Sequence, residues 1–105
     1  MDVVTTHALT EEHLLLDVRE PDEWAAGRIP GALHIPMGEL NERQAEIPDD
    51  RLIVVVCRSG NRSGVVTGAL ERAGYRAENL EGGMHAWHAA GQPMESDGDQ
   101  DPYVA

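Results

Sequence analysis

The residues with the clearest chemical potential are Cys57 and the polar loop that follows it, which reads CRSGNRS over residues 57–63. Cys57 is the only cysteine in the chain. Positive charge and a helix N-terminus both lower the pKa of a cysteine, and the resulting thiolate is a strong nucleophile. The loop carries two arginines and leads into a predicted helix, so we expect a reactive thiol that works by nucleophilic attack.

The other residues of the loop are of types that bind anions. Arg58 and Arg62 supply the positive charge, and Gly60 allows backbone N–H groups to turn inward and form an anion-binding nest. Ser63 is placed to cap the helix or to donate a hydrogen bond to the sulfur. The alternative is that Cys57 is a small, inert, buried residue at the end of a strand, as free cysteines often are. The two nearby guanidinium groups favour the reactive thiol.

The elements that must position this loop alternate between strands and helices along the chain. The predicted strands cover residues 3–4, 14–18, 32–35, 52–56 and 77–80. The predicted helices cover residues 21–26, 38–47, 61–73 and 84–90. Strands joined by helices are typical of right-handed crossover units, which build a parallel sheet with helices on both faces.

The strand at residues 52–56 is predicted to lie in the middle of the sheet. It is apolar on both faces and rich in β-branched residues, as a central parallel strand must be. Ligands of such sheets bind at the carboxyl ends of the strands. Cys57 directly follows this strand, so the sequence places the thiol at the ligand-binding edge.

Three stretches of the chain match the signatures of one family. Residues 16–24 read LDVREPDEW and run on into GRIPGA, residues 57–63 form the loop described above, and residues 80–87 read LEGGMHAW. In this order and spacing they resemble the rhodanese family of single-domain sulfurtransferases, over residues 3–93. The resemblance implies a three-layer α/β fold, a rhodanese-like arrangement in which a five-stranded, mostly parallel sheet has helices on both faces.

The resemblance also implies a reaction. The Cys57 thiolate would attack the sulfane sulfur of a donor such as thiosulfate, release sulfite and hold the sulfur as a persulfide. A thiol or cyanide would then accept the sulfur. The residues expected to bind the donor and the persulfide are Arg58, Ser59, Gly60, Asn61, Arg62 and Ser63. No cofactor and no metal ion is expected, and an ionised cysteine needs no general base.

Two other functions are weighed against this one. Cell-cycle dual-specificity phosphatases and some arsenate reductases share the fold but have a longer loop between the cysteine and the arginine. Here four residues separate Cys57 from Arg62, which favours a sulfur atom over a tetrahedral phosphate in the loop. The other alternative is a partner-dependent sulfur-relay or binding module with little activity on free thiosulfate.

Several polar residues outside the loop are candidates for supporting roles. Asp17 and Arg19 follow a predicted strand and could face the cleft, but an internal ion pair that fixes neighbouring loops is favoured. His34 is expected to be a hydrogen-bonded packing residue rather than a general base. His85 and His88 lie on one predicted helix, but no carboxylate or cysteine completes a metal site at a suitable spacing.

Composition limits the remaining possibilities. The 105 residues suit one domain, and we expect a rhodanese-like domain over residues 1–94 and an acidic, flexible tail over residues 95–105. The net charge of −11 disfavours nucleic acid and anionic membranes as partners and favours a monomer. A small anionic sulfur donor and a thiol acceptor are the expected partners. With a lone thiol and no recognisable export signal, a cytoplasmic location is expected.

Overall fold

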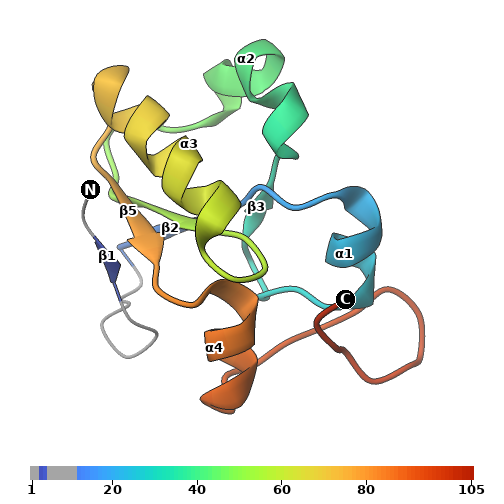
Figure 1. Cartoon of the computed structure of the whole chain (residues 1–105). Helices are drawn as coiled ribbons and strands as arrows, with labels where there is room; N and C mark the ends of the chain where they lie inside the picture. Colours follow the sequence, from blue (N-terminus) through green and yellow to red (C-terminus); the bar gives the residue numbers. More distant parts are fainter. Residues whose placement is uncertain (1–2, 5–11) are drawn as a thin grey trace.

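The structure is a computed structural model that describes residues 3–4 and 12–105. Within these residues, five parallel strands form one sheet in the order β1-β5-β4-β2-β3 (Figure 1). The strands are β1 (Val3–Val4), β2 (Leu14–Asp17), β3 (Leu33–His34), β4 (Ile53–Val56) and β5 (Ala77–Leu80). The parallel α/β sheet that the sequence predicts is confirmed, and β4 lies in its middle, as expected.

The helices are α1 (Pro21–Ala26), α2 (Leu40–Arg43), α3 (Asn61–Arg72) and α4 (Gly83–Ala89), and two 3-10 turns flank α2: η2 (Met37–Glu39) and η3 (Gln44–Glu46). The prediction of one continuous helix over residues 38–47 is therefore wrong. The backbone leaves α-helical geometry at Glu39, with φ −106° and ψ 0°, and again at Arg43, with φ −111° and ψ 14°. No side chain caps any of these short turns, and only Leu40 and Ile47 pack on the core, so little stabilises a longer helix.

Alternate residues of β4 point to opposite faces of the sheet, as the geometry of a strand requires. Ile53 and Val55 belong to the hydrophobic cluster that includes residues of α3. Val54 and Val56 belong to a second cluster, which includes residues of α4. All four side chains are fully buried. Helices therefore cover both faces of the sheet, and β4 is held rigidly up to the residue that precedes Cys57.

The acidic C-terminal segment lies beside α1 (Figure 1). The backbones of Arg28 and Glu95 exchange two hydrogen bonds of 2.9 Å, and the Arg28 guanidinium lies 2.8 Å from a carboxylate oxygen of Asp97. Further along, the Tyr103 N–H donates to the Ala26 carbonyl at 3.1 Å. These contacts join residues 95–105 to the domain. The flexibility of the segment stays a prediction.

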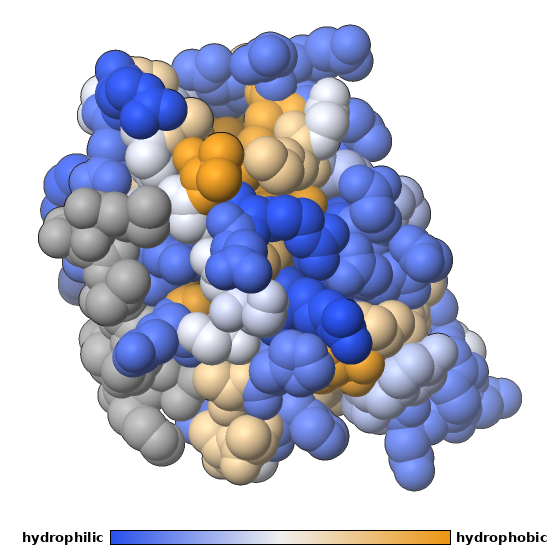
Figure 2. All heavy atoms as spheres, in the orientation of Figure 1, coloured by the Kyte–Doolittle hydropathy of each residue, from blue (hydrophilic) through white to orange (hydrophobic). Residues whose placement is uncertain are grey.

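Figure 2 shows a largely hydrophilic face on which hydrophobic atoms gather between α2 and α3. A cavity of about 300 Å³ lies there, and its apolar lining includes Met37, Leu40, Val65 and Leu70. Cys57 does not line this cavity, so the apolar hollow and the thiol are separate features of the surface. Among the described residues, no helix has the length and apolar character needed to cross a membrane.

Candidate active site

Cys57 lies where β4 ends and the loop into α3 begins, at the edge of the sheet where the strands have their carboxyl ends. The residue is only 1% exposed. The start of α4 holds the loop from outside, because Met84 N–H donates to Cys57 O at 2.9 Å and His85 N–H donates to Arg58 O at 3.1 Å. Gly83 lies so close to Cys57 O that a Cβ atom at this position would collide with it. The thiol therefore lies at the sheet edge that the sequence predicts.

Two hydrogen-bond donors face the Cys57 sulfur. Gly60 N–H donates to Sγ at 3.0 Å, and Ser63 Oγ donates to Sγ at 3.2 Å. Gly60 has a φ of 106°, a left-handed conformation that glycine adopts without steric cost, so its N–H turns inward as predicted. The predicted hydrogen bond from Ser63 to the sulfur is present, and Ser63 does not cap the helix.

The pKa of the Cys57 thiol is lowered from its ordinary value. Burial of the sulfur raises the pKa, but hydrogen bonds from Ser63 Oγ and from the backbone N–H groups of Ser63, Gly60 and Ser59 outweigh it. The sequence predicts this direction, with the helix start and two arginines as its cause. The structure adds to this cause, because the hydrogen-bond donors of the loop lower the pKa, while the charge of Arg62 interacts favourably with that of Cys57.

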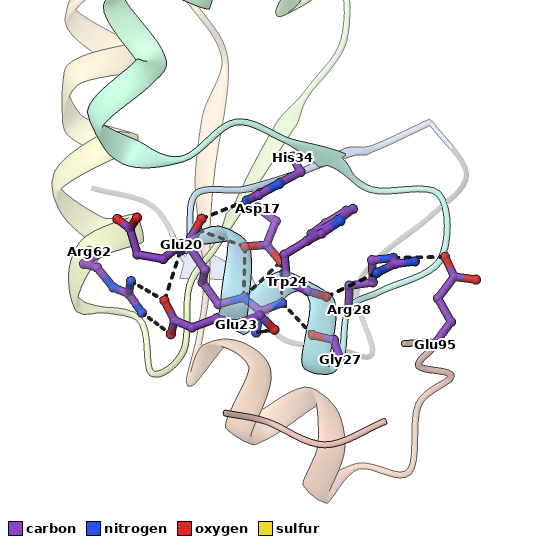
Figure 3. Close-up of polar contacts among 10 residues, drawn as sticks. Asp17, Glu20, Glu23, Trp24, Gly27, Arg28, His34, Arg62 and Glu95 are labelled. Carbon is purple, nitrogen blue, oxygen red and sulfur yellow. Dashed lines mark hydrogen bonds and ion pairs between the residues drawn. The ribbon is translucent and has the colours of Figure 1, made fainter. Parts of the chain in front are cut away.

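The two arginines of the loop have different surroundings. Arg58 is exposed, and among the described residues no side chain pairs with it. Arg62 is among the residues that the sequence predicts to bind the donor; in the structure it donates from Nη1 and Nη2 to the two carboxylate oxygens of Glu23, both at 2.8 Å (Figure 3). Glu23 belongs to α1, and the hydrogen bond with Arg62 lowers its pKa to about 2. The charge of Arg62 is therefore neutralised within the protein.

Asp17 and Arg19 form the internal ion pair that the sequence favours. Their side chains are 1% and 0% exposed, and Arg19 Nη2 lies 2.8 Å from Asp17 Oδ2. Arg19 also donates to the carbonyl oxygens of Glu23 at 3.3 Å and Gly27 at 2.7 Å. The pair thus fixes the position of α1, the helix that presents Glu23 to Arg62 (Figure 3).

His34 is a packing residue, as predicted. Its Nε2 lies 2.8 Å from Arg19 O, and its ring stacks on Trp24 with the ring centroids 4.4 Å apart. The Arg28 guanidinium carbon lies 5.1 Å from the centroid of the same Trp24 ring. Over residues 12–105, no group of three or more His, Cys, Asp or Glu side chains is arranged to hold a metal ion.

Asn79 is a residue of the site that the sequence reasoning missed. Its Oδ1 accepts a hydrogen bond from Ser63 Oγ, and its Nδ2 donates to Gly60 O at 3.1 Å. One signal could have found it: Asn79 is a polar residue near the carboxyl end of β5, and β5 pairs with β4, the strand that Cys57 follows. Glu23 was also missed, because 39 residues separate it from Arg62.

Comparison with known proteins agrees with the fold. The family model of the rhodanese-like domain matches residues 4–90. A protein named sulfurtransferase from Allochromatium vinosum is 48% identical over 86 residues, which cover 81% of this chain and 80% of that protein. The putative sulfurtransferase YtwF of Bacillus subtilis is 45% identical over 83 residues, covering 79% of this chain and 81% of that protein. The crystal structure of a rhodanese-related protein from Thermoplasma volcanium superposes with a TM-score of 0.85 at 32% identity, covering 90% of this chain and 98% of that one. The chain belongs to the rhodanese-like family.

Proposed function

We propose that this chain is a sulfurtransferase that carries a sulfane sulfur on Cys57 as a persulfide. The observation that carries the proposal is the pair of donors at the sulfur, Gly60 N–H at 3.0 Å and Ser63 Oγ at 3.2 Å. Such donors stabilise the negative charge of the thiolate before the reaction and the negative charge of the persulfide after it. Membership of the family and the names of the two relatives support this function.

Thiosulfate is the proposed small-molecule donor. The Cys57 thiolate attacks the outer sulfur of thiosulfate, a new S–S bond forms, and the old S–S bond breaks with its electron pair leaving on sulfite. The product is a persulfide anion on Cys57. A second thiolate, or cyanide, then attacks the outer sulfur of the persulfide and takes it away, which returns Cys57 to its thiolate form. No electrons are supplied from outside in either step.

The exposed residues Arg58, Ser59 and Asn61 form the rim that the donor meets first. Arg58 is proposed to attract the anionic donor, because the guanidinium of Arg62 is already paired with Glu23. The net charge of −11 opposes capture of an anion at long range, but salt screens distant charges beyond ~8 Å at physiological ionic strength. Local charge at the rim therefore decides the approach of the donor.

The engagement of Arg62 also bears on phosphatase chemistry. A phosphatase of this fold would need the arginine that ends the loop to bind the phosphate oxygens. Here that arginine makes a bidentate ion pair with Glu23, and only four residues separate it from Cys57. Both observations favour transfer of a sulfur atom.

A partner-dependent sulfur relay is the second candidate, and one observation favours it. Because Glu23 neutralises Arg62, the loop presents a single unpaired guanidinium, that of Arg58, to an anionic small molecule. Weak capture of free thiosulfate would follow, and a protein that delivers sulfur through its own contacts would be the better donor. We further propose, from the charge and the lone thiol, a cytoplasmic monomer that avoids nucleic acid.

The test is the intact mass of the purified chain after incubation with thiosulfate. A gain of one sulfur atom, absent from Cys57→Ser and removed by cyanide, is the expected result. Steady turnover of thiosulfate and cyanide by the isolated chain would support the enzyme. If a persulfide formed only with a protein persulfide donor, the relay would be supported. A chain that gained sulfur from neither donor would refute both.

A further inference from the structure

We propose that Asn79 is a positioning residue for the sulfur site, because its one side-chain amide bonds to both Ser63 Oγ and the backbone of Gly60, two residues that donate to Cys57 Sγ. A role of Asn79 in catalysis rests on the proposed sulfur transfer. The test measures only the reactivity of the Cys57 thiol, so the two proposals can fail separately.

The contacts of Asn79 form a closed set around the sulfur. Its Oδ1 accepts from Ser63 Oγ, and its Nδ2 donates to Gly60 O at 3.1 Å. Ser63 Oγ and Gly60 N–H donate to Cys57 Sγ at 3.2 and 3.0 Å. Asn79 is only 8% exposed, so water contributes little to holding either group.

The sheet fixes the place from which Asn79 acts. In the register of β4 and β5, Asn79 pairs with Val55, two residues before Cys57. Val55 is fully buried in the cluster under α3, and α3 begins with the segment that carries Ser63. The amide therefore projects from a buried strand toward the loop. A positioning group built on a strand holds its partners more accurately than one built on a loop.

Ser63 can serve both protonation states of Cys57 only because Asn79 is a second acceptor. Its hydroxyl has a single hydrogen atom and two acceptors within reach, Asn79 Oδ1 and Cys57 Sγ. When Cys57 is a thiolate, the hydrogen atom turns to sulfur. When the sulfur is protonated, the hydrogen atom turns to Asn79 and the serine oxygen accepts from the S–H group. Asn79 keeps Ser63 in place through both states.

An amide is the group that these contacts require, since one acceptor and one donor are needed side by side. Aspartate would offer acceptors only, would retain the hydrogen atom of Ser63, would leave Gly60 O without this donor, and would add negative charge near the thiolate. Leucine has a similar shape but neither polar group. The charged groups that face the loop, Arg62 and its partner Glu23, are unchanged in both variants.

The experiment compares the alkylation of Cys57 by iodoacetamide across pH in Asn79→Asp, Asn79→Leu and a control, Thr67→Val. Thr67 is buried on α3 and donates to the Ser63 carbonyl at 2.7 Å, but its hydroxyl does not bond to Ser63 Oγ, to Gly60 or to Cys57 Sγ. Since Cys57 is the only cysteine, the alkylation signal belongs to it alone. Melting temperatures of all variants report stability separately.

We expect Asn79→Asp to raise the midpoint of the alkylation profile by about one pH unit or more, which is about a tenfold loss of thiolate below the midpoint. Asn79→Leu should raise it by less, and Thr67→Val should lower the melting temperature while its midpoint stays unchanged. Ser63→Ala with Asn79→Leu should shift the midpoint by less than the sum of the single shifts. Midpoints that stay unchanged in both Asn79 variants would overturn the proposal and leave Asn79 as a packing residue. If either variant does not fold, Asn79→Ser takes its place in the same comparison, with the same expected direction.

Discussion

Replacing Glu23 by glutamine should destabilise the folded chain in a pH-dependent way. Glu23 is 14% exposed, and its two carboxylate oxygens accept hydrogen bonds from Arg62 at 2.8 Å. The hydrogen bond with Arg62 lowers the pKa of Glu23 from 4.5 to about 2. Because the folded pKa lies below the unfolded one, the stabilisation is present above pH 4.5 and is lost as the pH falls toward 2.

The structure sets the size of this effect. The interval from 4.5 to about 2 is 2.5 pH units, which corresponds to ~3.4 kcal/mol as an upper value. Arg62 is 35% exposed, so solvent screens the pair and reduces that value. We expect Glu23→Gln to lower the free energy of unfolding by about 1–2 kcal/mol at neutral pH, and by less than half as much near pH ~3.

Urea unfolding at neutral and acidic pH measures this difference. The matched control is Glu46→Gln, because Glu46 also makes two hydrogen bonds with an arginine, Arg43, at 2.7 and 2.9 Å, but on the exposed surface. The control should change the free energy of unfolding little at any pH. Equal losses in the two variants, or a loss for Glu23→Gln that does not shrink in acid, would refute the reasoning.

Three further predictions concern the loop. Cys57→Ser should abolish sulfur transfer and leave the melting temperature nearly unchanged; transfer near the original rate would exclude Cys57 as the carrier. The pKa of Cys57 is lowered, so the pH profile of its alkylation by iodoacetamide should have a midpoint below that of a free thiol, ~8.5. A midpoint at or above that value would contradict the role of the loop donors. Arg58→Ala should raise the KM for thiosulfate with kcat largely kept, and added salt should shrink the difference, since an exposed charge acts mainly by steering. A severe loss of kcat at every salt concentration would show instead that Arg58 acts in the chemical step.

Local patterns predicted most of the fold. The helix at residues 21–26 was predicted with its observed bounds, because Pro21 and the acids after it mark a helix start. The strand at residues 77–80 was also predicted with its observed bounds. The segment at residues 38–47 was predicted as one helix because its polar residues suit a helix. In the structure it forms three short turns, since no side chain caps them and no continuous face of the segment packs on the core. How much of the segment packs on the core depends on the rest of the fold, and the periodicity of the sequence does not predict it.

The candidate site divides in the same way. Contacts within the loop follow from neighbouring residues, and the donors Gly60 and Ser63 could be predicted for that reason. The partners Asn79 and Glu23 come from other elements, 16 and 39 residues away from Ser63 and Arg62, and only the assembled sheet brings them to the loop. The sequence therefore predicted the position of the thiol and its donors Gly60 and Ser63, but not the residues Asn79 and Glu23 that hold the loop.

The hydrogen bonds from α4 and β5 to the loop also fix the direction in which the peptide groups of the loop point. The carbonyl groups of Cys57 and Arg58 accept from Met84 N–H and His85 N–H of α4, and that of Gly60 accepts from the Asn79 amide and from Gly64 N–H. The atoms turned toward the sulfur are then hydrogen atoms of N–H and O–H groups. Soft metal ions such as Zn²⁺ and Cu⁺ also seek thiolates, but they need further sulfur, nitrogen or oxygen lone pairs around them. Because α4 and β5 already engage these carbonyl oxygens, we expect the shell around Cys57 Sγ to favour negative charge on sulfur over coordination of such a cation.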